Sequence, residues 1–300
     1  MKLFAGVDGG QSSTLAAIGD SDAVLGRGCG PPADLVGQAR DSQQTALAID
    51  AALDAALDAA GLERTTRFAA VVAGISGYED GLSVAPDLRL RGERARILHD
   101  TRIAHAAALR GAAGIVVIAG TGSVALGNDT LDGALLRAGG WGYFFGDEGS
   151  ALWIARTAVS RAMRADDRRE DSVLGEAACR FFEAQSLRGI QQKFAHGELS
   201  RSRLAAFAAE VLSAADAGEP ESCELRANAT SELAGLAATL DRELQPAESR
   251  LVSYVGGLFA NEGFVESFRA ALSSVLPRCE LRPPLGDPAL GALDLARQMR

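Results

Sequence analysis

The chain has 300 residues, of which 47% are hydrophobic and 23% are charged, a composition typical of a folded globular protein. Thirty basic residues against 39 acidic ones give a net charge of −9, and the basic residues are dispersed, which excludes a general binder of nucleic acid or anionic membrane. The length favours two domains, or one large α/β unit.

The chain begins with a predicted β-hairpin. Residues 2–7 are apolar and compatible with a strand, residues 8–13 (DGGQSS) predict a tight turn, and residues 14–18 resume the strand. A third short strand around residues 23–27 would complete a meander. This arrangement places an acid, Asp8, at the tip of the hairpin.

The next segments alternate between helix and strand. Apolar residues at spacings of three and four predict a helix over residues 38–60, with Gly61 as its C-terminal stop. Short apolar runs at residues 69–73 and 96–98 are typical of buried parallel strands, and residues 103–109 resemble a helix. This order predicts an α/β fold.

The hairpin pattern then occurs a second time. A strand at residues 114–119 meets the turn Gly120-Thr121-Gly122-Ser123, and a strand at residues 124–126 follows. The repetition suggests two related domains, the second beginning near Ala112, with the two turns facing each other across a cleft.

The remaining segments are mostly helical. Residues 139–150 are rich in glycine and aromatics, residues 151–164 predict a helix, and the Ala-rich residues 168–244 predict further helices. A strand at residues 250–255 runs into a Gly-Gly pair, and a last helix starts at residues 288–292.

Both glycine turns could hold a phosphate. Small residues let an anion approach backbone N–H groups, and Asp8 beside the first turn could hold Mg²⁺ directly or through water. A single turn of this kind is more often a plain hairpin, whereas two in equivalent positions are more informative. The second turn has neither the P-loop ending nor the dinucleotide fingerprint.

Three acids occupy positions where a ligand could bind. Asp100 follows the strand at residues 96–98, at the carboxyl end where ligands gather in open α/β sheets. An alternative role for Asp100 is to cap the following helix. Asp147 and Glu148 precede a helix and could interact with its dipole, or their loop could reach a polar ligand.

The cysteines and the N-terminus indicate a reducing compartment. Four cysteines lie far apart without a CxxC pair, and three histidines form no ligand spacing with them, so neither zinc nor a disulfide framework is expected. No apolar run reaches the roughly 20 residues that span a bilayer, and no signal-peptide pattern is present. We expect a cytoplasmic protein.

Taken in order, the motifs resemble a known family. DGGQSS, a strand ending at Asp100, AGTGS (residues 119–123), GGWGYFFGDEGSALWIA (residues 139–155) and VGGLF (residues 255–259) are similar to N-acetylglucosamine kinases of the BadF/BadG/BcrA/BcrD ATPase group. That group belongs to the superfamily of sugar kinases, actin and heat-shock chaperones. The similarity covers nearly the whole chain and is densest from Asp100 to Arg156.

The resemblance implies a fold and an activity. It implies an α/β protein of two ribonuclease H-like domains with an ATP and sugar cleft between them. Residues 1–111, joined by a last helix at about 289–300, would form the first domain, and residues 112–288 the second. It implies transfer of phosphate from ATP, with Mg²⁺, to the 6-hydroxyl of N-acetylglucosamine, in a cytoplasmic homodimer.

The resemblance also assigns the site residues. Asp100 falls on the catalytic base and also contacts the sugar, and Asp8 would position the metal. The ATP-binding positions are Gly9, Gly10, Ser12, Thr121, Gly122, Gly256 and Gly257. The sugar-contacting positions are Asp34, Ser123, Gly140, Trp141, Gly142, Tyr143, Phe144 and Asp147.

Two departures keep other functions open. Asp34 stands where similar kinases carry a sugar-binding Asn, and Val124 stands where a polar residue can contact the sugar. An acid at residue 34 could tolerate an ammonium group, which makes glucosamine an alternative acceptor. An ATPase activator of a 2-hydroxyacyl-CoA dehydratase, which needs cysteine ligands for an iron–sulfur cluster, and a non-catalytic ATP- or sugar-binding module are the rival classes.

Overall fold

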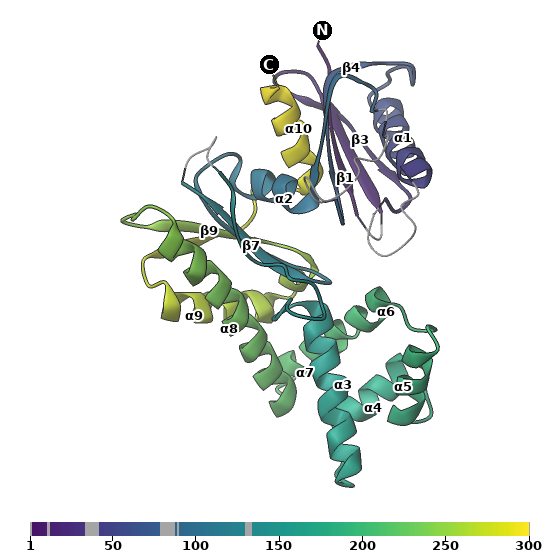
Figure 1. The fold of residues 1–300 in the computed structure, drawn as a ribbon, viewed down its shortest axis with the longest axis vertical. Coiled ribbons are helices and arrows are strands. Elements are labelled where there is room, and N and C mark those ends of the chain that lie inside the picture. Colours follow the sequence, from purple (N-terminus) through teal and green to yellow (C-terminus); the bar gives the residue numbers. More distant parts are fainter. Residues whose placement is uncertain are drawn as a thin grey trace. The chain divides into compact units, whose positions relative to one another are not determined.

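The computed structural model describes residues 2–10, 13–33, 42–78, 88, 90–129 and 134–299. The chain divides into two compact units, Met1–Ala113 with Pro283–Arg300, and Gly114–Arg282 (Figure 1). The C-terminal segment therefore completes the first unit. No helix among the described residues combines the length and apolar character needed to cross a membrane.

The first unit is built on a five-stranded sheet. Its strands are β1 (Phe4–Gly9), β2 (Thr14–Gly19), β3 (Val24–Gly30), β4 (Phe68–Ile75) and β5 (Gly92–His99). They lie in the order β3-β2-β1-β4-β5. The first three are antiparallel neighbours, whereas β4 and β5 run parallel to β1, as the sequence predicts.

The first predicted turn begins later than expected. Strand β1 continues through Gly9, so Asp8 lies within the strand, opposite Leu15 and Gly74, and the expectation that Asp8 sits at the hairpin tip is wrong. The ladder with β2 extends to the pair Gly9 and Thr14, which holds Asp8 in an extended conformation.

Helices cover both faces of this sheet. They are α1 (Ser42–Ala59) on one face, and α2 (Asp100–Leu109) and α10 (Pro288–Gln298) on the other (Figure 1). Alternate strand residues point to opposite faces. Ala5 and Val7 therefore pack in the core beneath α1, and Phe4 packs in the core beneath α10.

Glycines allow α10 to lie directly on β1 and α2. A Cβ at Gly6 would overlap backbone atoms of Ala289 and Leu293 on α10. A Cβ at Gly291 would overlap backbone atoms of Ile103 and Ala107 on α2. The contact is therefore between backbones, and it leaves no room for a side chain at either glycine.

The second unit has its own five-stranded sheet. Its strands are β6 (Gly114–Ala119), β7 (Ser123–Asn128), β8 (Leu136–Gly139), β9 (Arg250–Val255) and β10 (Cys279–Arg282). Their order, β10-β9-β6-β7-β8, and their directions match those of the first sheet with β6 in the place of β1. The predicted α/β fold with two such sheets is confirmed. The short edge strands β8 and β10 were not predicted, and both have four residues.

Helices make up the rest of the second unit and share one core with its sheet (Figure 1). They are α3 (Ala151–Asp167), α4 (Val173–Phe181), α5 (Leu187–Ala195), α6 (Arg201–Ala206), α7 (Ala208–Asp216), α8 (Pro220–Glu243), the short 3₁₀ helix η1 (Gly257–Ala260) and α9 (Glu262–Val275). Serine N-caps precede α3, α4, α5 and α6, each accepting a backbone hydrogen bond from the first turn. Helix α9 was not predicted from the sequence.

The contact between β1 and α10 yields the first prediction. We expect Gly6→Ala to lower the melting temperature, because the new methyl group forces two backbones apart; overpacking of this kind costs about 1 to 3 kcal/mol or more. The matched control is Gly235→Ala in α8, where a Cβ meets nothing within 4 Å. That control should be neutral or stabilising by up to about 1 kcal/mol. Equal melting temperatures for wild type and Gly6→Ala would contradict the close packing.

Candidate functional site

The carboxyl ends of three parallel strands meet at one edge of the first sheet. Gly9 pairs with Ile75, and Ile75 pairs with His99, so these three residues form a row across β1, β4 and β5. Asp8 lies one residue before this row and Asp100 one residue after it. The strand register therefore brings both acids to this edge, whereas the sequence predicted such a position for Asp100 alone.

Asp8 shares its sheet face with helices α2 and α10. It alternates with Phe4 and Gly6 along β1, and this face carries the N-terminal residue of α2, Asp100, and the N-cap of α10, Asp287. Enclosure by protein atoms is the main cause that raises the pKa of Asp8 to about 7, and the charges of Asp100 and Asp287 raise it further. The site is therefore an electrostatically unfavourable place for a third negative charge.

Asp100 begins α2 and does not cap it. The N-cap is His99, whose Nδ1 accepts a hydrogen bond from the Thr101 backbone N–H at 3.2 Å, so the alternative role of Asp100 as a cap is wrong. The Asp100 Oδ1 atom is buried, has no hydrogen-bond partner among the described residues, and lies 2.7 Å from His99 Nδ1.

In the glycine turn after β1, the backbone groups of Gly10 already form hydrogen bonds within the protein. The Gly10 N–H donates to the Ser13 carbonyl at 3.1 Å, and the Gly10 carbonyl accepts from Ala33 N–H at 3.0 Å. A Cβ at Gly9 would come within 2.9 Å of the Ala33 carbonyl, which explains the glycine there. Two predicted site residues, Ser12 and Asp34, lie outside the described residues.

In the second unit, the corresponding turn rests on the start of α3. Residues 120–122 form the turn between β6 and β7, and Ser123 is already the first residue of β7. The carbonyls of Gly120 and Thr121 accept hydrogen bonds from the N–H groups of Ala151 and Leu152, at 2.9 and 3.4 Å. These bonds fix the turn against the N-terminus of α3.

Asp147 lies against this turn. Its backbone has a positive φ of 61°, and a Cβ at Gly122 would come within 2.7 Å of Asp147 Oδ2, so a side chain there would displace the carboxylate. Burial raises the pKa of Asp147, and backbone hydrogen bonds from Ser123 and Gly142 oppose the shift. The structure thus brings together four residues that the sequence singled out in the second unit: Gly122, Ser123, Gly142 and Asp147.

The loop between β8 and α3 is attached to the same strand. The Ser123 hydroxyl donates to the Glu148 carbonyl at 2.7 Å, and the Ser123 carbonyl accepts from the Gly140 N–H at 3.1 Å. Its aromatic side chains are nevertheless exposed: Trp141 by 72%, Tyr143 by 43% and Phe144 by 75%. Aromatic groups held on the surface by an ordered loop are typical of a binding surface.

Gly256 and Gly257 lie beside the second turn. Val255 of β9 pairs with Ile118 of β6, and the next residue, Gly256, packs on Ala119 with a φ of 120°. A Cβ at Gly256 would overlap the Ala119 carbonyl, whereas Gly257 faces open space. The predicted Gly-Gly motif is therefore adjacent to the strand that leads into Gly120.

Two charged residues at these sites were missed from the sequence. Asp287 accepts a hydrogen bond from Leu290 N–H and pairs with Arg27. Its position before Pro288 is a helix-start signal, but nothing in the sequence connects it with Asp8. Arg201 lowers the pKa of Asp147 and stacks on Tyr143, and it carries no sequence motif.

No group of three or more His, Cys, Asp or Glu side chains suited to holding a metal occurs within the described ranges. A Mg²⁺ ion at Asp8 would therefore depend on waters and on oxygen atoms of a bound phosphate, which is its usual environment. All four cysteines are described, and each is a free thiol.

Known proteins resemble this chain in both sequence and fold. A relative from Clostridium acetobutylicum, an N-acetylmuramic acid/N-acetylglucosamine kinase, is 26% identical over 99% of both chains. A solved structure from Chromobacterium violaceum, described as a candidate N-acetylglucosamine kinase, has a TM-score of 0.81 with 28% identity over 99% of both chains. A ROK family glucokinase from Streptomyces griseus, solved with glucose and AMPPNP, has a TM-score of 0.62 with 20% identity and covers 99% of this chain and 100% of its own.

The glucokinase comparison concerns the fold alone, and it agrees with the two five-stranded sheets. The family model of the BadF/BadG/BcrA/BcrD ATPases matches residues 5–296 and so spans both sheets and all the motifs singled out above. The family resemblance predicted from the sequence is confirmed, and this protein belongs to the BadF/BadG/BcrA/BcrD ATPase family.

Proposed function

We propose that this protein is an ATP-dependent kinase that transfers the γ-phosphate to the 6-hydroxyl of N-acetylglucosamine. The observation that carries the proposal is that Asp8 and Asp100 lie near each other at the carboxyl edge of the first sheet. Phosphoryl transfer needs a group that holds the metal and a group that orients and deprotonates the acceptor, and these two acids supply both. Family membership and the names of the similar proteins support the same reaction class.

Asp8 is the proposed metal ligand. Its neighbours Asp100 and Asp287 add negative charge, and a divalent cation would relieve the repulsion that raises the pKa of Asp8. The acids present therefore fit Mg²⁺. When bound, the ion would neutralise charge on the phosphate oxygens, while Asp8 would fix its position relative to the glycine turn.

Asp100 is the proposed general base. Its side chain is 30% exposed, so one part of the carboxylate is enclosed while the group remains accessible to a substrate. Contact of Oδ1 with His99 and the location at the helix start restrict its orientation. In this role, Asp100 would accept the proton of the sugar 6-hydroxyl as the phosphoryl group is transferred.

The remaining assignments follow the family pattern. Gly9, Gly10, Ser12, Thr121 and Gly122 would contact the ATP phosphates, and Gly256 with Gly257 the adenosine. Because the Gly10 N–H already donates to Ser13, Gly10 would contribute space and not a free donor. The Gly-Gly motif has the required openness at Gly257.

The sugar contacts are proposed for Asp34, Ser123, residues 140–144 and Asp147. Asp147 is enclosed next to Gly122, and an enclosed carboxylate accepts hydrogen bonds from sugar hydroxyls in place of water. The exposed rings of Trp141, Tyr143 and Phe144 supply apolar surface for a sugar ring and its acetyl group. Glucosamine is the second candidate acceptor, because Asp34 could pair with its ammonium group.

A panel of hexoses and amino sugars tests the proposal. The purified protein is incubated with ATP, Mg²⁺ and each sugar, and release of ADP is measured with and without a chelator. We expect the highest kcat/KM with N-acetylglucosamine and no turnover in the chelator. Absence of acceptor-dependent ADP release with every sugar would overturn the kinase assignment. Light scattering of the same sample tests the proposed homodimer, and fractionation of cells tests the proposed cytoplasmic location.

Replacing Asp100 by Asn tests the base. We expect kcat to fall by about 10²- to 10⁴-fold with little change in ATP affinity, because the amide keeps the shape but cannot accept the proton. Asp22→Asn is the matched control, since Asp22 is an exposed acid of the same unit. Turnover of Asp100→Asn close to that of the control would show that Asp100 is not the base.

The raised pKa of Asp8 predicts a pH-dependent stability. Its pKa is about 7 in the folded protein against an ordinary 3.8, so the folded state binds the proton more tightly than the unfolded state. Ionisation of Asp8 therefore lowers the free energy of unfolding progressively as the pH rises from about 4 to about 7.

Urea denaturation of wild type and Asp8→Asn in metal-free buffer at several pH values measures this effect. We expect the stability difference to grow in favour of the variant between pH 4 and pH 7 and then to level off. Added Mg²⁺ should stabilise the wild type at pH 8 and not the variant. A difference that is constant with pH would contradict the shifted pKa.

The charge of Asp34 tests acceptor choice. Asp34→Asn keeps the size of the side chain and removes its charge, so we expect the ratio of kcat/KM values to shift toward N-acetylglucosamine relative to glucosamine. Steady-state kinetics with both sugars measures the ratio. Unchanged values for both sugars would assign acceptor choice to Ser123, Val124 and residues 140–147.

A further inference from the structure

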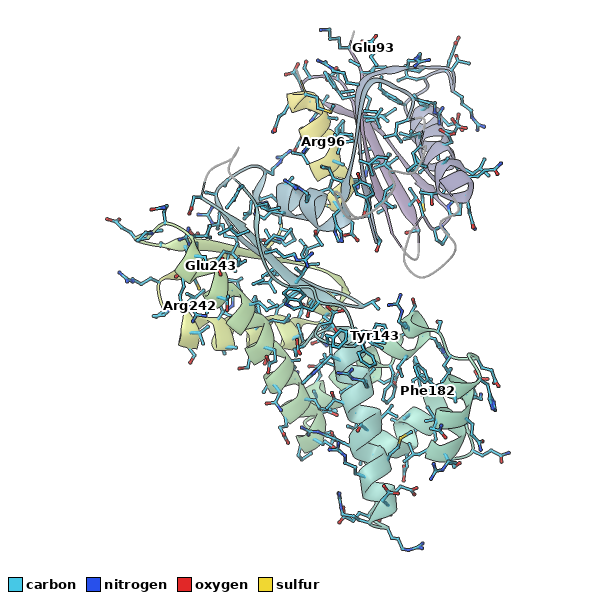
Figure 2. All side chains as sticks on the ribbon, in the orientation of Figure 1. Glu93, Arg96, Tyr143, Phe182, Arg242 and Glu243 are labelled. Carbon is cyan, nitrogen blue, oxygen red and sulfur yellow. The ribbon has the colours of Figure 1, made fainter. Side chains whose placement is uncertain are left out.

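The second unit contains an apolar cavity of about 390 Å³. Helices α3, α5 and α6 form its walls, and the loop carrying Tyr143 and Phe144 borders it; Figure 2 shows Tyr143 beside the N-terminal part of α3. Its volume lies in the range of small-molecule sites, roughly 300 to 1,000 Å³. The walls are mainly aliphatic and aromatic, including Leu152, Val159, Met163, Ile190, Phe194 and Leu204.

Two arginines line the same cavity. The Arg201 guanidinium lies over the Tyr143 ring at 5.0 Å, and Arg156 donates to the Tyr143 carbonyl at 3.0 Å. No acidic residue lines the cavity in the part of the chain that the structure describes. The cavity therefore has apolar walls and two positive charges on one side, where both arginines contact Tyr143.

Arg156 and Arg201 resemble Arg164 and Arg203, which also have no ion-pair partner among the described residues, and differ from two other arginines nearby. On the same helix as Arg156, Arg161 pairs with Glu224 at 2.9 Å, and just beyond that helix Arg168 pairs with Glu170 at 2.7 Å. Neither Arg156 nor Arg201 has a carboxylate within ion-pair distance among the described residues, although the protein carries a net charge of −9.

We propose that this cavity binds a small amphipathic carboxylate, that is, a carboxylate group on an apolar chain. The apolar walls would bury the chain, with each methylene adding to the affinity. The guanidinium groups would pair with the carboxylate through charge-assisted hydrogen bonds, for which their planar geometry is suited. Charge complementarity selects this ligand over a neutral one, which the walls alone would accept equally well.

The cavity is connected to the candidate sugar site. Arg201 lowers the pKa of Asp147, and Tyr143 belongs both to the cavity border and to the proposed sugar-contacting loop. A carboxylate on Arg201 would offset that positive charge at Asp147. This consequence for sugar binding rests on the proposed function, whereas binding of the carboxylate does not.

Calorimetric titration with octanoate, 1-octanol and acetate tests the proposal in the absence of ATP and sugar. We expect saturable binding of octanoate, at least tenfold weaker binding of 1-octanol, and none of acetate. Arg201→Met and Arg156→Met should each weaken octanoate at least fivefold without changing the affinity for 1-octanol. Arg164→Met, an arginine on α3 that does not line this cavity, is the matched control and should bind octanoate like the wild type.

Ser160→Phe, which places a ring at the cavity wall, should abolish binding of both octanoate and 1-octanol; its melting temperature reports whether it is folded. The titration is run without sugar because Tyr143 and Phe144 line the cavity and are also proposed sugar contacts. Equal affinity for octanoate and 1-octanol, or full affinity in Arg201→Met, would overturn the proposal. A kinase assay without activity would leave the titration result intact, so the two proposals fail separately.

Discussion

The backbone contact between β1 and α10 determines how the candidate site of the first unit is assembled. Gly6 allows the helix to lie on the strand, and Gly291 allows the same helix to lie on α2. Since Asp8 is two residues beyond Gly6 on the same face, this packing places the N-terminus of α10 beside it. Asp287, near the end of the chain, thus adds to the burial and to the Asp100 charge that raise the pKa of Asp8.

This arrangement has an energetic cost that is informative about function. Burial, followed by the charges of Asp100 and Asp287 at two helix N-termini, raises the pKa of Asp8 to about 7. Favourable helix dipoles at Asp100 and Asp287 offset part of the repulsion. A charge arrangement that lowers stability when the site is empty is typical of a place that receives a cation or a proton.

The second unit repeats the strand order, but its close contacts involve different groups. There Gly256 lies on Ala119, and Gly122 leaves room for the Asp147 carboxylate, so glycines again set the distance between backbone and functional group. Fixed on the N-terminus of α3, the turn holds Asp147 next to Ser123. The aromatic loop that follows is tied down by backbone hydrogen bonds while its rings remain exposed.

Much of this could be predicted from local pattern. The two hairpins, the parallel strands and the helices at residues 42–59, 151–167 and 288–298 follow from apolar periodicity and glycine turns, which depend only on neighbours in sequence. The edge strands β8 and β10 could not be predicted, because four residues show too little periodicity and such short strands form only beside neighbouring strands. Asp8 was assigned to a turn because pairing with β2 and β4, not its own propensity, keeps it extended.

From the sequence alone, Asp8, Asp100, Asp147 and the two glycine turns could be proposed as the candidate site, because motif and position depend only on the order of the residues. Only the tertiary structure decided their surroundings. Asp287 reaches Asp8, and Arg201 reaches Asp147, across long stretches of chain. Burial and Coulomb interactions act through space, so the charges that shift these carboxylates are defined by packing and carry no signal in the order of the residues.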